Sequence, residues 1–295
     1  MKSLYDVPAP AKLNLFLHIT GKRADGYHLL QSVFALIDWC DTLHFELRDG
    51  GAISREDLGQ PLPERDLIVR AAKALQNAGA VRHGVHIAVD KKIPAQAGLG
   101  GGSSDAASCL LALNRLWRLN LSLAQLSRIG LGLGADVPFF LNGRNAWVEG
   151  IGEKITPLEL ACARYLVVKP PDGLQTARIF GHPALEISTK TATISGFAAN
   201  PGRFGGNDLQ AVAQRLCPGV NQALEWLASH GLTGRMTGSG SAVFASAGQD
   251  AEEFDLGDAP NSFLARWCSG LDVHPLMGWA SSDDLPVGGV SCQPV

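Results

Sequence analysis

Paired cysteines and long apolar runs are both missing from this 295-residue sequence. Its six cysteines are scattered without a Cys-x-x-Cys motif, and its eight histidines likewise lack metal-ligand spacing. This distribution argues against a zinc site or a disulfide framework and is typical of buried thiols in a reducing compartment. No apolar run is long enough to cross a bilayer, and residues 1–10 carry no hydrophobic signal core. We therefore expect a soluble, cytoplasmic protein that does not bind a membrane.

A block of positive charge is also missing. The 25 lysines and arginines are balanced by 28 aspartates and glutamates, which gives a formal net charge of −3. The electrostatic footprint of a nucleic-acid-binding protein is therefore absent, and we expect no nucleic acid partner. The composition, 46% hydrophobic and 18% charged, is that of a globular protein. At ~150 residues per domain, this length fits one large or two medium domains.

Glycine, by contrast, is concentrated in one stretch, whose residues are Pro94, Ala95, Gln96, Ala97, Gly98, Leu99, Gly100, Gly101, Gly102, Ser103 and Ser104. An alternating, strand-like pattern precedes it at residues 85–89, and helical spacing follows it from residue 106 to 117. Either serine suits the N-cap of that helix. The order strand, glycine loop and helix brings backbone amides and the positive end of a helix dipole to one point. This arrangement predicts an anion site, most often occupied by phosphate.

The alternative is a flexible loop or a helix start that binds nothing, since glycine clusters are common. Two familiar phosphate-binding motifs do not fit. The P-loop requires a lysine directly after its last glycine, and none follows here. The dinucleotide fingerprint requires a third glycine where Ser103 stands.

Residues 9–20 alternate between the two faces of a predicted strand, and Lys12 and Asn14 project from the same face. That face is either solvated, the commoner fate of a lysine, or part of a site. A polar turn then leads to Tyr27 and His28, which either bind a flat ligand such as a base or begin a strand that covers the core. Asp136, a lone carboxylate among small and apolar residues, is either functional or a helix N-cap. On its own pattern the N-cap is favoured.

The remaining segments predict a mixture of helices and strands. We expect helices near residues 66–78, 122–131, 207–216 and 218–229, strands near 29–47, 145–155 and 165–169, and a short helix capped by Thr176. Residues 48–66 predict a loop or an irregular hairpin, and residues 186–206 show little periodicity. A second glycine cluster, residues 237–241, predicts a tight loop that enters a buried strand, and residues 281–295 predict a frayed tail.

Four of these motifs, in this order, resemble those of the GHMP small-molecule kinases. They are the segments at residues 9–15, 94–104, 134–139 and 237–241. A fifth segment, residues 23–28, resembles one distinctive of the members that phosphorylate a cytidine-diphospho sugar alcohol. The resemblance covers roughly the first 180 residues and then residues 235–246.

The resemblance implies an α/β (α+β) fold with two domains and an active-site cleft between them. The first, ribosomal S5 domain 2-like, would be the ATP-binding domain at residues 1–155, and the second an α/β domain at residues 156–295. It implies transfer of the γ-phosphoryl group of ATP to the 2-hydroxyl of the sugar alcohol, with Mg²⁺ accompanying ATP. We assign the metal no protein ligand, and we expect a monomer or a weak homodimer.

The resemblance also implies the roles of individual residues. Asp136 would take or orient the hydroxyl proton, and Lys12 beside it would stabilise charge in the transition state. Lys91 and the loop of residues 94–104 would bind ATP. Substrate contacts would come from Asn14, Tyr27, His28, Thr176, Phe180, Gly238, Ser239 and Gly240.

Two other functions remain open at this stage. The chain could be a GHMP kinase for a small aliphatic alcohol such as homoserine or mevalonate, for which a cytosine-binding Tyr27–His28 pair would have no use. It could instead be a catalytically inactive nucleotide-binding protein on the same fold. The presence of both Lys12 and Asp136 argues against the second possibility.

Overall fold

The computed structural model describes residues 1–59, 61–64, 66–161, 163–187, 191–248, 253–257, 259–260 and 262–282. The strands are β1 (Ser3–Lys22), β2 (His28–Arg48), β3 (Ile53–Asp57), β4 (Gly84–Asp90), β5 (Ala146–Gly150), β6 (Lys154–Pro157), β7 (Arg164–Lys169), β8 (Gly234–Met236), β9 (Val243–Ala247) and β10 (Leu264–Leu271). The helices are α1 (Leu67–Ala78), α2 (Gly101–Leu116), α3 (Leu123–Leu131), α4 (Val137–Asn142), α5 (Thr176–Phe180), α6 (Ile194–Ala199), α7 (Gln210–Leu216) and α8 (Pro218–Ser229).

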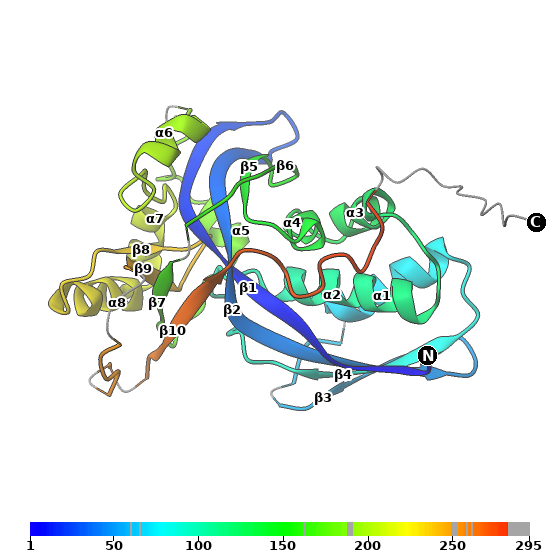
Figure 1. The fold of residues 1–295 in the computed structure, drawn as a ribbon. Coiled ribbons are helices and arrows are strands. Elements are labelled where there is room, and N and C mark those ends of the chain that lie inside the picture. Colours follow the sequence, from blue (N-terminus) through cyan, green and yellow to red (C-terminus); the bar gives the residue numbers. More distant parts are fainter. Residues whose placement is uncertain are drawn as a thin grey trace, which may run out of the picture.

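One sheet runs through the whole molecule, in the order β3-β4-β2-β10-β7-β9-β8, with β1 and β5 also paired to β2. Helices α1 to α4 pack on the part formed by the first half of the chain, and α7 and α8 pack on the part formed by the second half (Figure 1). The long antiparallel pair β1–β2 spans both parts. The predicted mixture of α and β elements is confirmed.

The alternation predicted for residues 9–20 is part of β1, which is longer than expected at both ends. Both faces of its middle are buried, because helices α1 and α2 cover one side and strands β7 and β9 lie toward the other. The polar face with Lys12 and Asn14 is therefore not solvated: these residues are 3% and 2% exposed. A buried lysine requires compensating partners, which points to a site.

Helix ends follow local chemistry in two predicted places. The carboxylate of Asp66 accepts the Val69 N–H at the start of α1, and Ser122 forms a capping box with Gln125 at the start of α3. The predicted serine cap of α2 is wrong. Helix α2 begins three or four residues earlier, after Gly100 in the left-handed conformation, and has no side-chain cap. Its first amides are thereby left for another partner.

Two stretches of irregular composition contain regular elements. Residues 48–66, predicted to be a loop or an irregular hairpin, contain β3, which pairs in parallel with β4, and residues 186–206, for which no element was predicted, contain α6. Both elements are short and lie in turn-rich stretches, where periodicity gives little signal. Thr176 begins α5 without capping it, since the N-cap position belongs to Gln175. The tail predicted from residue 281 lies outside the described residues from residue 283 onward.

The end of the described chain returns to the first half. Strand β10 pairs with β7 and, at its last two residues, with β2. After β10, Leu276 joins the core formed by α1, α2 and β4, and Arg144 bridges to Val273. The predicted division at residue 155 therefore stays a prediction, since the sheet is continuous and residues 272–281 cross back. None of the described helices has the length and apolar content needed to cross a bilayer.

Candidate active site

A cleft of about 580 Å³ lies where the glycine loop, the start of α2, the middle of β1 and the turn at residues 237–240 meet. Most of the predicted site residues line it, namely Lys12, Asn14, Lys91, Pro94, Ala95, Gln96, Ala97, Gly98, Leu99, Gly100, Gly101, Gly102, Ser103, Asp136, Thr176, Phe180, Gly238, Ser239 and Gly240. These residues come from both halves of the chain. The structure thus brings together motifs that are more than 200 residues apart in the sequence.

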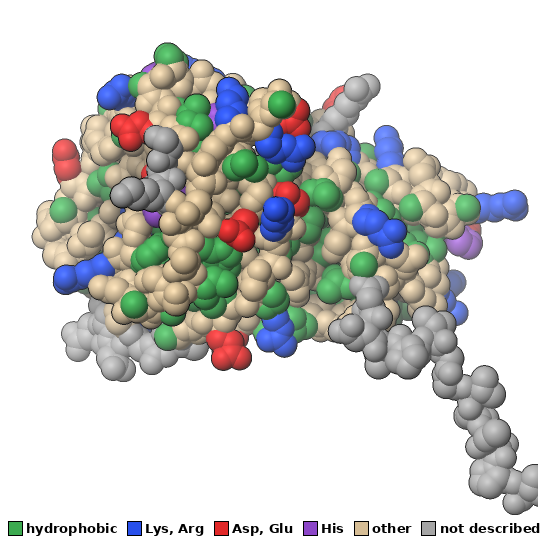
Figure 2. Space-filling view, turned by 90° about the horizontal axis from the view of Figure 1, so that it is seen from above, with side chains coloured by type: hydrophobic (Ala, Val, Ile, Leu, Met, Phe, Trp, Pro, Cys, Tyr) green, Lys and Arg blue, Asp and Glu red, His purple; other side chains and the backbone are tan. Residues whose placement is uncertain are grey.

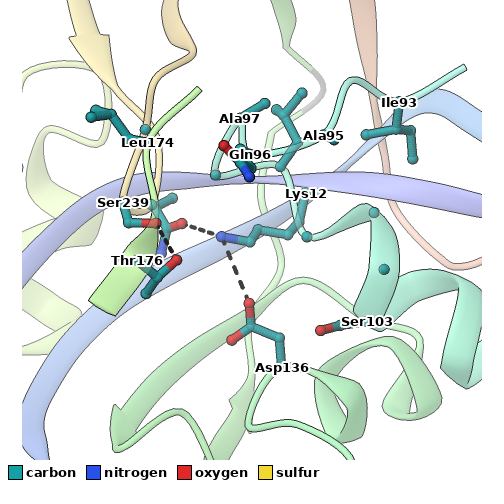
Figure 3. A pocket seen from close by; sticks show the side chains of 18 of the residues that line it. Lys12, Ile93, Ala95, Gln96, Ala97, Ser103, Asp136, Leu174, Thr176 and Ser239 are labelled. Atoms are coloured by element: carbon teal, nitrogen blue, oxygen red, sulfur yellow. Dashed lines mark hydrogen bonds and ion pairs between the residues drawn. The ribbon is translucent and has the colours of Figure 1, made fainter. Parts of the chain in front are cut away.

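Lys12 and Asp136 face each other across this cleft (Figure 3). Nζ of Lys12 lies 4.0 Å from Oδ2 of Asp136, and the aspartate side chain is 31% exposed while the lysine side chain is only 4% exposed. Asp136 occupies the N-cap position of α4, but its carboxylate makes no capping hydrogen bond. The helix-cap alternative therefore does not account for this carboxylate, which is open to a ligand in the cleft.

The environment of Lys12 fixes its ammonium group. Its Nζ donates a hydrogen bond to Oδ1 of Asn14 and lies 4.9 Å from the centre of the Phe34 ring. Nδ2 of Asn14 donates in turn to Oγ of Ser32. Burial lowers the pKa of Lys12, and the nearby Asp136 opposes that shift. Asn14 thus positions Lys12, a role that the sequence did not indicate.

The glycine loop leaves the first turn of α2 open. The first intrahelical bond runs from Ser104 N to Gly100 O at 2.9 Å, so the amides of residues 101–103 precede the hydrogen-bond ladder. Amides at a helix N-terminus, together with the helix dipole, favour an anion. The predicted contact of Ser104 with ATP cannot come from its side chain. Ser104 is fully buried, and its hydroxyl donates to the carbonyl oxygen of Pro10 at 2.6 Å.

The two glycine clusters lie in direct contact. Gly98 has φ +74°, and a Cβ there would lie 2.2 Å from the carbonyl oxygen of Thr237, so only glycine fits. Backbone N–H groups of Ser241 and Ala242 donate to the carbonyls of Gln96 and Ala97, both at 3.1 Å. The loop from the first half is therefore held by the loop from the second half.

The side chain of Asn207, which the sequence did not single out, stabilises this contact between the two glycine loops. Nδ2 of Asn207 donates to the carbonyl oxygens of Met236 and Gly238, both at 2.8 Å. The backbone of Asn207 also bridges to Leu17 of β1. A lone asparagine at the start of a predicted helix gave no signal, because its partners are backbone carbonyls about 30 residues away.

At the far end of the cleft, Phe180 is a lining residue, whereas His28 contacts it and does not line the cleft. His28 lies against Phe180, with ring centres 5.2 Å apart, and the hydroxyls of Thr176 and Ser239 are hydrogen-bonded at 2.9 Å. Burial lowers the pKa of His28, as does the charge of Lys22. Tyr27 is 60% exposed and is not among the lining residues. Of the three aromatic and imidazole side chains predicted to bind the base, His28 and Phe180 thus lie together, and the role of Tyr27 stays a prediction.

Lys91 lies at the opposite end, and its ammonium is shared by two carboxylates. Nζ donates to Asp105 at 2.5 Å and also to Asp41. Both aspartates are almost completely buried. The sequence did not single out Asp41, because it shows a carboxylate inside a hydrophobic strand but not the distant residues that the carboxylate contacts. Elsewhere in the described residues, no group of three or more His, Cys, Asp or Glu side chains could hold a metal ion.

Comparison with known proteins agrees with this geometry. The family model described as the GHMP kinases N terminal domain matches residues 66–144, and that for the GHMP kinases C terminal matches residues 191–259. The 4-diphosphocytidyl-2-C-methyl-D-erythritol kinase of Albidiferax ferrireducens is 70% identical, over 98% of this chain and 99% of its own length. That of Variovorax paradoxus is 62% identical, over 95% and 100%.

The chain belongs to this group of GHMP kinases. A crystal structure of 4-(cytidine 5'-diphospho)-2C-methyl-D-erythritol kinase is 31% identical and superposes with a TM-score of 0.73, over 91% of this chain and 99% of that one. A mevalonate kinase structure, 15% identical with a TM-score of 0.66, shares the fold. The expected two-domain GHMP kinase fold and the assignment as a kinase are confirmed.

Proposed function

We propose that this GHMP kinase transfers the γ-phosphoryl group of ATP to the 2-hydroxyl of 4-diphosphocytidyl-2-C-methyl-D-erythritol, giving the 2-phosphate and ADP in non-mevalonate isoprenoid biosynthesis. The observation that carries the proposal is the Lys12–Asp136 pair in front of an open helix N-terminus. Relatives of 61–70% identity over nearly the whole chain are named for this substrate.

The reaction needs positioning and charge stabilisation rather than covalent chemistry by the protein. The substrate 2-hydroxyl oxygen forms a bond to the γ-phosphorus, the bond from that phosphorus to the β,γ-bridging oxygen breaks, and ADP leaves. Asp136 accepts or orients the hydroxyl proton. Lys12, fixed by Asn14, stabilises the negative charge that develops on the transferred group.

The nucleotide phosphates would lie against residues 98–103, whose amides and helix dipole suit an anion. Mg²⁺ bound to those phosphates neutralises their charge during transfer. We assign the metal no particular protein residue and propose that phosphate oxygens, a serine hydroxyl and water would hold it.

The cytosine would bind at the His28–Phe180 pair, since an aromatic face stacks on a base and a neutral imidazole offers one donor and one acceptor to its edge. Thr176 and the turn of Gly238, Ser239 and Gly240 would contact the diphosphate. Tyr27 stays in the proposal as a residue at the rim that covers the base.

We also propose that the enzyme acts in the cytoplasm as a monomer or weak homodimer, without nucleic acid or a membrane. Acidic and basic side chains are interspersed on the face seen in Figure 2, and the net charge is −3. Sedimentation of the purified chain at several concentrations checks the oligomeric state.

The deciding experiment measures ADP release from Mg-ATP with the cytidine alcohol, with homoserine and with mevalonate. We expect turnover with the cytidine compound alone. Asp136→Asn should still bind both substrates yet lose at least about 100-fold in kcat, since a positioned acid or base contributes about 10²–10⁴-fold. Near-full activity of Asp136→Asn, or turnover with another alcohol, would contradict the proposed chemistry or the proposed substrate respectively.

A further inference from the structure

Asp41, in the middle of β2, holds the chain at the point where the glycine loop begins. It is 0% exposed. Its Oδ1 accepts the backbone N–H groups of Lys92 at 2.6 Å and Ile93 at 2.7 Å, and its Oδ2 accepts the ammonium of Lys91. One carboxylate thus binds three consecutive residues of the turn after β4. Hydrogen bonds from N–H groups to a charged acceptor are about twice as strong as neutral ones.

The same turn lies against the first residue of α2. A Cβ on Gly101 would lie 3.0 Å from Cγ2 of Ile93 and 3.5 Å from Oδ2 of Asp41. The carboxylate and the turn that it binds are therefore packed directly beneath the amides that the helix leaves open. A shift of Asp41 or of the turn would therefore move residues that pack against the start of α2 in the proposed phosphate site.

Lys91 extends this connection to the far side of the loop. Its ammonium joins Asp41 on β2 to Asp105 in the second turn of α2, with 2.5 Å to Oδ2 of Asp105. The Asp41–Lys91–Asp105 group thus fixes both ends of the loop of residues 94–100, namely the turn before it and the start of α2 after it. Because the loop itself is rich in glycine, its own sequence does little to fix its path.

We propose that Asp41 is a positioning residue for ATP, which acts by holding residues 91–93 and, through Lys91, the start of α2 in the arrangement that the phosphates require. The inference builds on the proposed use of the glycine loop for ATP. Removal of Asp41 takes the shared acceptor from the N–H groups of Lys92 and Ile93, of which the second is buried, and leaves the Lys91 ammonium with Asp105 alone, so we expect the turn to shift. We expect the proposed substrate contacts at Phe180 and Ser239 to be kept, because they lie on other elements and the turn that carries Ser239 meets the loop at residues 96–98 and not at residues 91–93.

The test compares Asp41→Asn, Asp41→Ala and a matched control, Asp38→Asn. The amide side chain of Asp41→Asn keeps an acceptor for the two N–H groups and loses the charge that faces Lys91. Asp38 lies on the same strand and accepts one backbone N–H, from Ser269 at 2.9 Å, but it is exposed and away from the cleft. Binding of a non-hydrolysable ATP analogue is measured by calorimetry, and KM is measured for ATP and for the alcohol.

We expect Asp41→Ala to lose about 100-fold in kcat/KM for ATP, the scale of a 1 Å misplacement, with a smaller loss in Asp41→Asn. The KM for the alcohol and all constants of Asp38→Asn should stay at wild-type values. If Asp41→Ala does not fold, the same measurements on Asp41→Asn test the proposal. Analogue affinity unchanged in a folded Asp41 variant, or equal losses for ATP and the alcohol, would overturn the inference. The calorimetric measurement of analogue affinity tests the role of Asp41 even if the proposed alcohol is not the substrate.

Discussion

At the scale of single residues, the Asp41–Lys91–Asp105 group determines the protonation state of Asp105. Two buried carboxylates share one ammonium, and among the described atoms Oδ1 of Asp105 has no hydrogen-bond partner. Burial raises the pKa of Asp105 from 3.8 to about 8, opposed by Lys91 and reinforced by Asp41. Asp66 at the start of α1 and Cys109 one turn further along α2 are the other titratable groups nearby. We therefore expect Asp105 to hold a proton at neutral pH, unlike Asp41.

This proton predicts how ATP binding depends on pH. Above pH 8, Asp105 loses it and adds negative charge beside the proposed phosphate site, so we expect the KM for ATP to rise there. Asp105→Asn, which cannot titrate, should show a flat profile over the same range. A wild-type profile without this rise, or the same rise in the variant, would rule Asp105 out.

Stability should depend on the same proton with a definite sign. Since the folded state holds the proton up to about pH 8 and the unfolded chain releases it near 3.8, the folded state binds more protons between these values. Unfolding free energy should therefore fall as pH rises through this window. Urea unfolding of wild type and Asp105→Asn at several pH values measures the difference that belongs to this residue.

The His28–Phe180 pair yields a further prediction at this scale. His28→Ala should raise the KM for the cytidine alcohol by roughly 2- to 13-fold, since a hydrogen bond to the base edge is worth about 0.5–1.5 kcal/mol. The KM for ATP should not change, and Tyr27→Ala should have the same selectivity with a smaller effect. His44→Ala is the control, because His44 also lies against an aromatic ring, Tyr5, at 5.9 Å, far along the sheet. Equal changes for both substrates would place the base elsewhere.

At the scale of elements, the contact between the two glycine loops depends on Asn207. Asn207→Ala leaves the carbonyls of Met236 and Gly238 without their donor, which should cost about 1–3 kcal/mol of stability. The turn that carries Ser239 then loses its support, so the KM for the alcohol should rise as well. Asn207→Asp should behave similarly, because a carboxylate cannot donate.

A matched control for this prediction is Asn221→Ala. Asn221 also makes side-chain hydrogen bonds, to Gln214, but it lies on α8 away from the cleft. Denaturant unfolding and steady-state kinetics on the three variants separate the two effects. A loss of stability in Asn207→Ala with unchanged kinetics would make Asn207 a structural residue only.

Local chemistry explains which elements could be predicted from the sequence. Long alternation revealed β1, the cap Ser122 marked the start of α3, and apolar spacing placed the start of α1 near Asp66, because the causes of all three lie within a few residues. The start of α2 was wrong, since Gly100 takes the left-handed conformation and Ser104 instead bonds to Pro10, 94 residues away. Strand β3 exists because β4 pairs with it, not because its own sequence is strand-like.

The candidate site was predictable to the extent that its motifs are local. Lys12 and Asn14 share a face by strand geometry, but their proximity to Asp136 came only from the family resemblance. Asn207 and Asp41 could not be predicted, because both act on the backbone of distant segments. The direct contact of His28 with Phe180 could not be predicted for the same reason, since Phe180 lies on α5, far along the chain.

At the scale of the whole molecule, the cleft depends on how firmly the two halves are joined. Strand β10 pairs with β2 and β7, and the segment after it packs Leu276, 3% exposed, into the core of α1, α2 and β4. The second half of the chain therefore completes the core of the first. We expect the two halves to unfold together, although the active site lies between them.

Leu276→Ala tests this coupling. A buried Leu→Ala change costs about 2–5 kcal/mol, so the urea midpoint should fall while a single transition is kept. Its neighbour Met277, 37% exposed, is the control, and Met277→Ala should leave the midpoint unchanged. Two separate transitions in the wild type would mean that the halves are independent. A wild-type midpoint in Leu276→Ala would mean that the returning segment does not stabilise the first half. A lower midpoint with one transition makes the returning segment part of what holds the cleft in place.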